Sequence, residues 1–247
     1  MVPSSWCLGM ASILVCRSVA VPVLFFAPKW PSRPFFVMRH GTIDFVGADG
    51  FCKMTTHEQF STQLGLFPEF VAQQQEKLEL KEKISWSGSD SVVKTFDGRQ
   101  LFQVEGKAWS MSARKHVRDG QGRDLFTIRK HVWSCLLPSY YIEDLAGNRI
   151  CEVSGSWSWA HTKAKCDFVS IGGKSETLSL RGNWTHTGAE IKHEPTGQMV
   201  ANITRTMKAR DLFANAQTYT IFVAPNVDMA LMVAICVCLD DRTTNSS

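Results

Sequence analysis

The sequence predicts a mainly β protein in which an antiparallel β-barrel encloses a hydrophobic C-terminal helix. Three observations lead to this fold class. Apolar and polar residues alternate in short segments between about residues 69 and 224, as in half-buried strands. Turn sequences that contain Asp and Gly recur between those segments. Residues 229–239 form a segment without charge, which favours a buried helix.

The first clear strand is KLELKEKISW, residues 77–86. Leu78, Leu80, Ile84 and Trp86 fall on one face, while charged and polar residues fill the other. This period of two predicts a strand with one face in the core and one in solvent.

Five turn sequences punctuate the chain after this strand. Each pairs Asp, Glu or Gly with a nearby Gly, residue types that supply positive φ angles and local side-chain hydrogen bonds. They are FDGRQLFQV (96–104), RDGQGRDLFTI (118–128), EDLAGNRICEV (143–153), HEPTGQMVANI (193–203) and IGGK (171–174). The apolar segments between them predict eleven or twelve strands, a number that indicates a sandwich or a barrel.

The terminal helix is too short to cross a membrane. Eleven residues span roughly 17 Å at about 1.5 Å per residue, against a hydrocarbon core of about 30 Å. Its large side chains cover every direction of a helical wheel: Met229, Leu231, Met232, Val233, Ile235, Val237 and Leu239. Asp228 is placed to cap the first turn, and a second short helix is expected at residues 207–215. A closed sheet supplies the dry interior that such a terminal helix needs, so we predict that the helix fills a barrel.

Charge and cysteine content exclude several classes of protein. The chain has 27 basic and 23 acidic residues, but residues 1–43 contain four of the bases and no acid. The remainder is therefore neutral and lacks the broad positive field of a nucleic-acid-binding protein. The eight cysteines form no CxxC pair, so we expect scattered reduced thiols in a cytoplasmic protein rather than disulfides.

Residues 1–60 form a leader to which the sequence assigns no fold. Residues 1–30 are apolar and acid-free, and Arg17 splits two hydrophobic patches, whereas a secretory signal places its positive charge before the apolar run. Organelle targeting by residues 1–40 and an unstructured leader both stay open. The domain itself is expected at residues 61–241, followed by a polar tail at 242–247.

Residues 67–241 resemble the LURP-one-related family of the tubby C-terminal-like superfamily, which also includes the phospholipid scramblases. The resemblance rests on LELKEKISWSGS, FDGRQLFQVEGKAWSMSARKHVRDGQGRDLFTIRK, EDLAGNRICEV, GNWTHTGAEI and QTYTIFVAPNVDMALMVAICVCLDD. The last segment is the most specific. The resemblance implies a twelve-stranded barrel around the C-terminal helix, in agreement with the residue pattern.

The sequence contains no complete catalytic or cofactor-binding motif. His57-Glu58 and His193-Glu194 lack the second histidine of an HExxH zinc site, and no GxSxG or phosphate-binding glycine motif occurs. We expect a non-enzymatic domain without cofactor or metal. Scramblase-like activity is disfavoured, because the acidic calcium-binding segment of those relatives is missing before the helix.

The leading hypothesis is peripheral binding of anionic, phosphoinositide-like membrane lipid, as the resemblance to tubby proteins implies. Guanidinium and ammonium groups grip phosphates, and three basic groups are candidates: Arg114, Lys115 and Arg118 with His116 in one loop, Lys163 with Lys165 on one strand face, and Arg205 with Lys208 and Arg210. Solvated strand edges are the alternative reading of these charges. A protein-interaction scaffold without lipid affinity is the second hypothesis.

Trp157 and Trp159 share one strand face. They belong to the core if they point inward, and to a sugar- or membrane-contacting surface if they point outward. We favour the core.

Overall fold

The computed structural model describes residues 35–39, 42–47, 50–52, 60–85, 88–106, 114–131, 139–158, 161–183, 188–206 and 217–244. The chain divides into two units, residues 1–54 and 55–247. In the first unit, β1 (Phe35–Arg39), β2 (Thr42–Gly47) and β3 (Gly50–Cys52) form a three-stranded antiparallel sheet. The sequence pattern did not predict this sheet.

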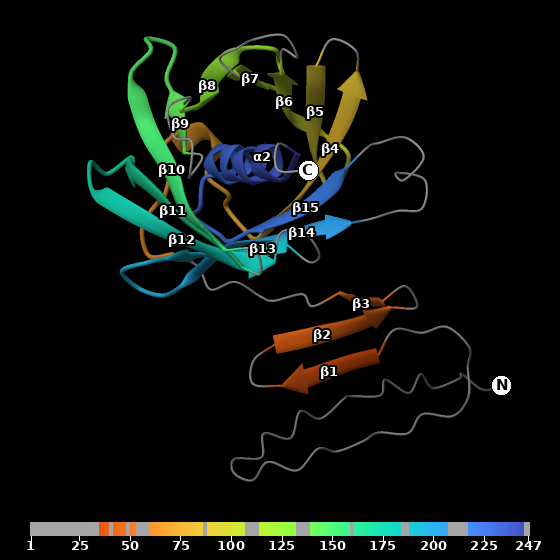
Figure 1. Cartoon of the computed structure of the whole chain (residues 1–247). Coiled ribbons are helices and arrows are strands. Elements are labelled where there is room, and N and C mark those ends of the chain that lie inside the picture. The colour runs from red at the N-terminus through yellow and green to blue at the C-terminus, as the bar shows by residue number, and fades with distance from the viewer. Residues whose placement is uncertain are drawn as a thin grey trace, which may run out of the picture. The chain divides into compact units, whose positions relative to one another are not determined.

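The second unit is a closed barrel of twelve antiparallel strands around one helix, as predicted (Figure 1). After the 3₁₀ turn η1 (Pro68–Phe70), its strands are β4 (Glu76–Ser85), β5 (Gly88–Thr95), β6 (Gln100–Gly106), β7 (Arg114–Asp119), β8 (Asp124–Lys130), β9 (Tyr140–Glu143), β10 (Arg149–Ser158), β11 (His161–Val169), β12 (Ser175–Asn183), β13 (Gly188–His193), β14 (Met199–Thr206) and β15 (Thr218–Val223). Strand β15 pairs with β4 and closes the ring. Closure leaves the barrel without an unpaired sheet edge.

All five predicted turns connect neighbouring strands of the barrel. Each contains a glycine with φ between 70° and 88°: Gly98, Gly122, Gly147, Gly173 and Gly197. A left-handed φ is accessible to glycine without a Cβ clash. Because the strands alternate in direction, these turns all lie at one end of the barrel, which we call the turn rim.

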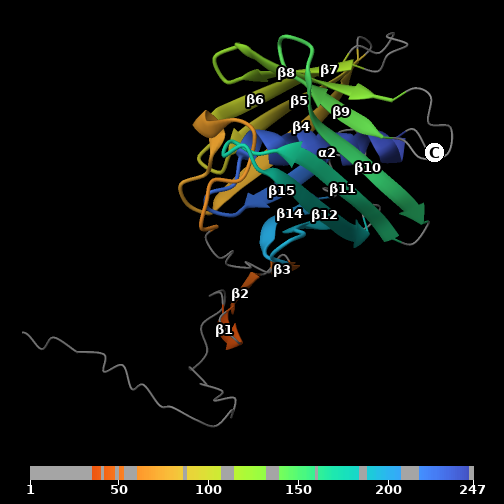
Figure 2. The same ribbon diagram turned by 90° about the vertical axis from the view of Figure 1, so that its left-hand side faces the viewer.

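Helix α2 (Met229–Thr244) runs through the barrel interior from the turn rim toward the opposite end (Figure 2). The predicted helix residues are 3% exposed or less, except for Met229, which is partly buried against the core. Burying each large apolar side chain stabilises the fold by about 1.5–3 kcal/mol. The barrel wall contributes the facing side chains, such as Leu78, Leu80 and Ile191, which are fully buried.

Asp228 fixes the helix to the turn rim. One carboxylate oxygen, Oδ1, accepts hydrogen bonds from the backbone N–H groups of Ala230 and Leu231 at 2.8 and 3.3 Å, so it caps the helix as predicted. The other, Oδ2, accepts from the N–H groups of Leu66 and Phe67, each at 2.9 Å. Burial raises the pKa of Asp228 to about 6, although these four donors lower it.

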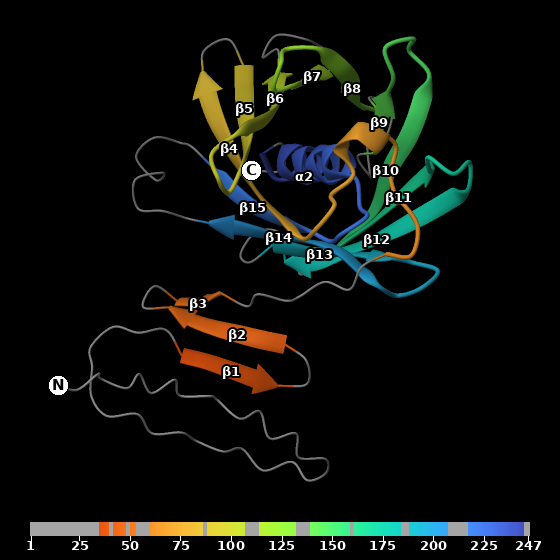
Figure 3. The same cartoon turned by 180° about the vertical axis from the view of Figure 1, so that it is seen from behind.

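The two donors to Oδ2 belong to residues 60–75, which cross the N-terminal end of α2 (Figure 3). Leu64 bridges to Val227, and Val71 bridges to Asp228. A Cβ on Gly65 would overlap the Asp228 side chain, so only glycine fits where the segment passes the cap.

Polar side chains surround α2 at the opposite end, which we call the polar mouth. Glu82 of β4 is 5% exposed and lies two residues after the buried Leu80, on the inward face where the alternation predicts an apolar residue. Its Oε2 has no hydrogen-bond donor among the described residues. Burial and the charge of Asp240 raise the pKa of Glu82 to about 7. A proton on Glu82 allows it to donate to Asp240.

Two tyrosines and one lysine complete the polar mouth. Tyr219 hydrogen-bonds Asp240, and Tyr140 donates to Asp241 at 2.9 Å. Lys115 Nζ lies 3.4 Å from Asp241 Oδ1. These contacts hold the last turns of α2 against β7, β9 and β15.

Ala234→Asp tests the burial of the helix. Ala234 is fully buried near the middle of α2, and an uncompensated carboxylate there costs several kcal/mol. We expect the variant to be insoluble or unfolded in urea and thermal titrations. The matched control is Ala146→Asp in an exposed turn, which should stay within about 0.5 kcal/mol of the parent. A soluble Ala234→Asp variant that melts cooperatively at the parent temperature would contradict the assignment.

Glu82→Gln tests the protonation of the polar mouth. The pKa of Glu82 is higher in the folded protein than its ordinary value of 4.5. The contribution of Glu82 to stability is therefore fully present below about pH 4.5 and is lost as the pH rises through about 7. An uncharged Gln donor should preserve the contact with Asp240 at every pH. We expect the variant to match the parent in acid and to exceed it above pH 7 in urea unfolding.

Glu79→Gln is the control, because Glu79 lies on the same strand but faces outward and pairs with Lys81 at 3.4 Å. It should retain the pH dependence of the parent. Equal pH dependence of the parent and Glu82→Gln would show that Glu82 is ionised throughout.

Candidate functional site

The strongest candidate site is a basic groove on the outer wall of β10, β11 and β12. Lys163 of β11 and Arg181 of β12 are direct cross-strand partners. Lys165 lies on the same outward face of β11, since Ala164 and Cys166 between and beside them point into the core. The pleat therefore places three cations on one surface.

The groove has a volume of about 480 Å³, which lies within the range of about 300–1,000 Å³ for ligand sites. Its lining combines small residues with cations and one acid: Ser154, Gly155, Lys163, Ala164, Lys165, Ser179, Leu180, Arg181 and Glu194. Serine hydroxyls add hydrogen-bond donors beside the cations. The groove is therefore suited to a small anionic group.

A second hollow of about 390 Å³ adjoins the groove and shares Arg181. Two glycines shape it. A Cβ on Gly182 would overlap the carbonyl oxygen of Gly188, and a Cβ on Gly188 would overlap that of Ile203. The glycines therefore allow β12, β13 and β14 to approach closely.

Only part of the positive charge in the groove is neutralised. Lys165 Nζ lies 2.9 Å from Glu194 Oε1, and this hydrogen bond raises the pKa of Lys165. Lys163 and Arg181 form no ion pair with any residue that the structure describes. Arg181 lies directly opposite Glu190 in the β12–β13 register, so Lys163 and Arg181 are the candidates to contact a ligand, with one acid beside Arg181.

The first predicted basic group lies on a strand, not in a loop. Arg114, Lys115, His116 and Arg118 belong to strand β7, so their assignment to one loop was wrong. Alternate side chains of a strand face opposite sides, and the group is split between the outer wall and the interior.

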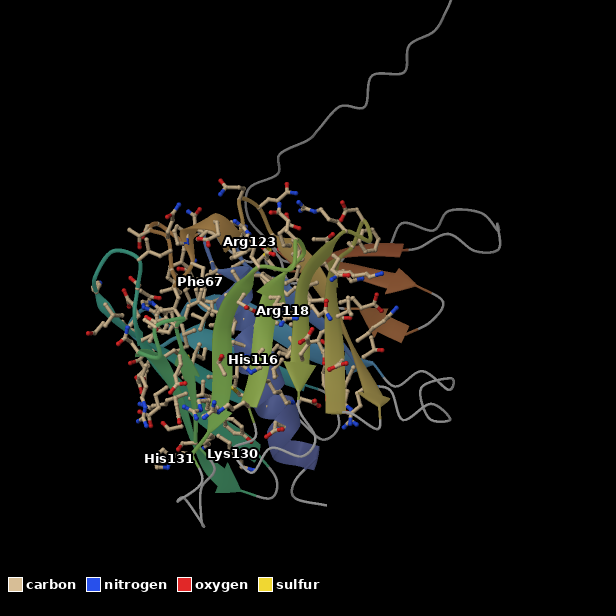
Figure 4. All side chains as sticks on the ribbon, turned by 90° about the horizontal axis from the view of Figure 1, so that it is seen from above. Phe67, His116, Arg118, Arg123, Lys130 and His131 are labelled. Atoms are coloured by element: carbon tan, nitrogen blue, oxygen red, sulfur yellow. The ribbon has the colours of Figure 1, made fainter. Side chains whose placement is uncertain are left out.

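On the outer wall, Arg118 is ion-paired with two carboxylates. It contacts Glu105 at 2.6 Å and Asp124 at 2.7 Å, and both partners raise its pKa. Figure 4 shows Arg118 and His116 on this wall, between Arg123 at the turn rim and Lys130 near the polar mouth. Arg114 is exposed at the start of the strand. This wall is ion-paired and less suited to an external anion than the groove.

Lys115 and Arg205 belong to the polar mouth. The side chain of Lys115 is 14% exposed and pairs with Asp241. Arg205 is half-buried opposite Tyr219 in the β14–β15 register, and its charge lowers the pKa of Asp240, which burial raises. Lys208 and Arg210 lie outside the described residues, as do the side chains of Trp157 and Trp159 and the helix expected at 207–215. The third basic group is therefore untested as a cluster.

A hydroxyl–imidazole–carboxylate chain lies near the turn rim. His193 Nε2 is 2.7 Å from Glu176 Oε2, and His193 Nδ1 is 2.8 Å from Thr196 Oγ1. Phe60 packs edge-on against the imidazole with ring centroids 5.2 Å apart, and His193 and Glu176 are both buried. The chain joins β12 to the β13–β14 turn and supports the segment that begins at Phe60.

Arg181 is a candidate site residue that the sequence analysis missed. It is 18 positions from Lys163, so no local spacing connects the two. The IGGK turn provided the signal, because a hairpin centred there pairs β11 with β12 in the observed register.

In the part of the chain that the structure describes, no group of three or more His, Cys, Asp or Glu side chains is arranged to hold a metal ion. No described helix has the length and apolar character needed to cross a membrane.

The chain is similar to proteins of Arabidopsis thaliana. Protein LURP-one-related 15 of Arabidopsis thaliana is 23% identical over 172 residues, which cover 66% of this chain and 77% of that protein. An X-ray structure of a protein from Arabidopsis thaliana superposes with a TM-score of 0.48 at 17% identity and covers 72% of this chain and 96% of its own.

A family model described as LURP-one-related matches residues 76–240, which extend from the first residue of β4 into the last turns of α2. This match includes every strand of the barrel and both sides of the groove. The chain belongs to the LURP-one-related family.

Proposed function

We propose that this domain binds an anionic, phosphate-bearing lipid headgroup in the basic groove and thereby associates peripherally with membranes. The observation that carries the proposal is the cross-strand pair of Lys163 and Arg181, which lines a hollow of about 480 Å³ and forms no ion pair among the described residues. The guanidinium fork and the ammonium group together match the geometry and charge of a phosphate.

The charge distribution of the chain supports a local site. Outside residues 1–43, bases and acids are equal in number, so a general positive field does not attract anions. On the β7–β8 wall, Arg118 and Arg129 are paired with carboxylates. Binding is therefore expected to depend on the groove residues. The proposal places the domain at a cytoplasmic membrane face, where anionic lipids are concentrated.

Lys163→Ala/Arg181→Ala tests this function. Each basic residue near an anionic membrane surface contributes about 1 kcal/mol, so the double variant should bind vesicles roughly thirtyfold more weakly. The measurement is flotation with phosphatidylcholine vesicles that contain a minor fraction of phosphatidylinositol 4-phosphate. Inorganic phosphate as a competitor distinguishes recognition of phosphate alone from recognition of a lipid-borne group.

The matched control is Lys81→Ala/Lys94→Ala, which removes the same charge from the wall of β4 and β5. Both control residues are exposed. We expect its vesicle binding to stay within about twofold of the parent. An equal loss of vesicle binding in both variants would show that only the net charge of the domain matters. Unchanged binding of the groove variant would refute the site.

A further inference from the structure

Large apolar side chains are exposed at one end of the barrel. Among the described residues, four such side chains are exposed: Phe96 at 81%, Leu145 at 70%, Val169 at 56% and Ile171 at 37%. Each belongs to a turn of the turn rim or to the strand end beside it. The turns need only Gly and polar residues for their geometry, so local structure does not explain these apolar side chains.

Cations accompany the exposed apolar residues. Arg99 follows Phe96 in the same turn, and Lys77 Nζ lies 4.9 Å from the centre of the Phe96 ring. Arg149 follows the turn of Leu145. Lys174 ends the turn of Ile171; its side chain is 78% exposed, and its Nζ lies 3.8 Å from Glu176 Oε1. Three hairpins thus repeat one combination of an apolar tip and a nearby base.

In two of these hairpins, the acidic side chain accepts hydrogen bonds from groups of its own turn. Asp144 Oδ1 accepts hydrogen bonds from the N–H groups of Ala146 and Asn148 at 2.9 and 2.8 Å. Asp97 accepts from the Thr95 hydroxyl. These hydrogen bonds satisfy both carboxylates and lower their pKa, so both stay ionised. The rim surface therefore combines exposed apolar groups with side chains of both charges.

We propose that the turn rim is a membrane-contacting surface, in which Phe96, Leu145, Val169 and Ile171 enter the interfacial layer of a phospholipid bilayer while Arg99 and Lys174 meet lipid phosphates. This inference rests on the proposed membrane association and adds the surface that makes the contact. Apolar groups that enter the acyl boundary beside cations at the phosphate level are the arrangement by which interfacial segments bind membranes.

The arrangement of the tips favours a bilayer over a protein partner. Phe96 and Leu145 come from hairpins separated by the β7–β8 turn, whose residues 120–123 contain no apolar side chain. A protein interface has a contiguous apolar centre, whereas a fluid bilayer accepts separate insertions. Val169 is four residues from Lys165 on the outward face of β11, or roughly 13 Å. The rim and the groove therefore lie on connected parts of the wall.

Phe96→Ser/Leu145→Ser/Ile171→Ser in the full-length chain tests the rim. The variant is compared with the parent, the groove variant and Gln121→Ser, which changes an exposed polar residue of the same rim. Flotation uses vesicles of phosphatidylcholine alone and vesicles that also contain phosphatidylinositol 4-phosphate. We expect the rim variant to bind both kinds roughly tenfold or more weakly, with Gln121→Ser unchanged.

The two vesicle compositions separate this inference from the proposed function. The groove variant should lose only the gain that the anionic lipid provides and keep its binding to phosphatidylcholine. Unchanged vesicle binding of the rim variant would overturn the rim proposal and would not affect the proposal that the groove binds an anionic headgroup. Binding by the parent that does not respond to anionic lipid would overturn the groove and leave the rim standing. No binding of the parent to either composition would overturn both.

Hydrogen–deuterium exchange of the unmutated chain gives a reading that does not depend on variants folding. Vesicles should slow exchange at residues 96–99, 144–148 and 170–174 and leave the β7–β8 wall unchanged. Exchange at these turns that vesicles leave unchanged would overturn the proposal. Protection confined to the groove would also overturn it.

Discussion

The structure depends on the contact between an uncharged helix and the inner wall of a closed sheet. Helix α2 has apolar side chains in every direction, so no single packing partner can cover it. Twelve strands enclose it completely, and the core residues of the helix are at most a few per cent exposed. The helix in turn fills a space that the wall side chains alone would leave empty, and an empty core is strongly destabilising. Barrel and helix therefore stabilise each other.

Two sets of polar contacts hold the two ends of this helix, and they differ in chemistry. At the turn rim, Asp228 satisfies four backbone N–H groups from the helix and from residues 66 and 67. At the polar mouth, Asp240 and Asp241 meet Tyr219, Tyr140 and Lys115. The first set of contacts consists of hydrogen bonds to one carboxylate, whereas the second contains the carboxyl pair of Glu82 and Asp240. Burial raises the pKa of a carboxyl group at both ends, of Asp228 to about 6 and of Glu82 to about 7, so both ends of the barrel respond to pH.

The alternating pattern and the turns predicted the fold well, because both are local properties of the chain. The five glycine turns lie where the sequence placed them, and Asp228 caps α2 as expected. The site was predicted less well. Lys163 and Lys165 share the expected face, but their partner Arg181 lies on another strand. Lys115 resembles a surface base in sequence, yet its inward position directs it to Asp241.

By itself, the sequence determined which segments are strands, where they turn and that the terminal helix is buried, since periodicity and turn chemistry act over a few residues. The tertiary structure decided which charges remain available. Arg118 forms ion pairs with two carboxylates on neighbouring strands, whereas Lys163 and Arg181 lie opposite each other and form no ion pair among the described residues, although Glu190 is the register partner of Arg181 on β13. It also decided that the exposed apolar tips of separate hairpins gather at one end. Strand register and ring closure set these distances, and both arise only when residues far apart in the chain pair.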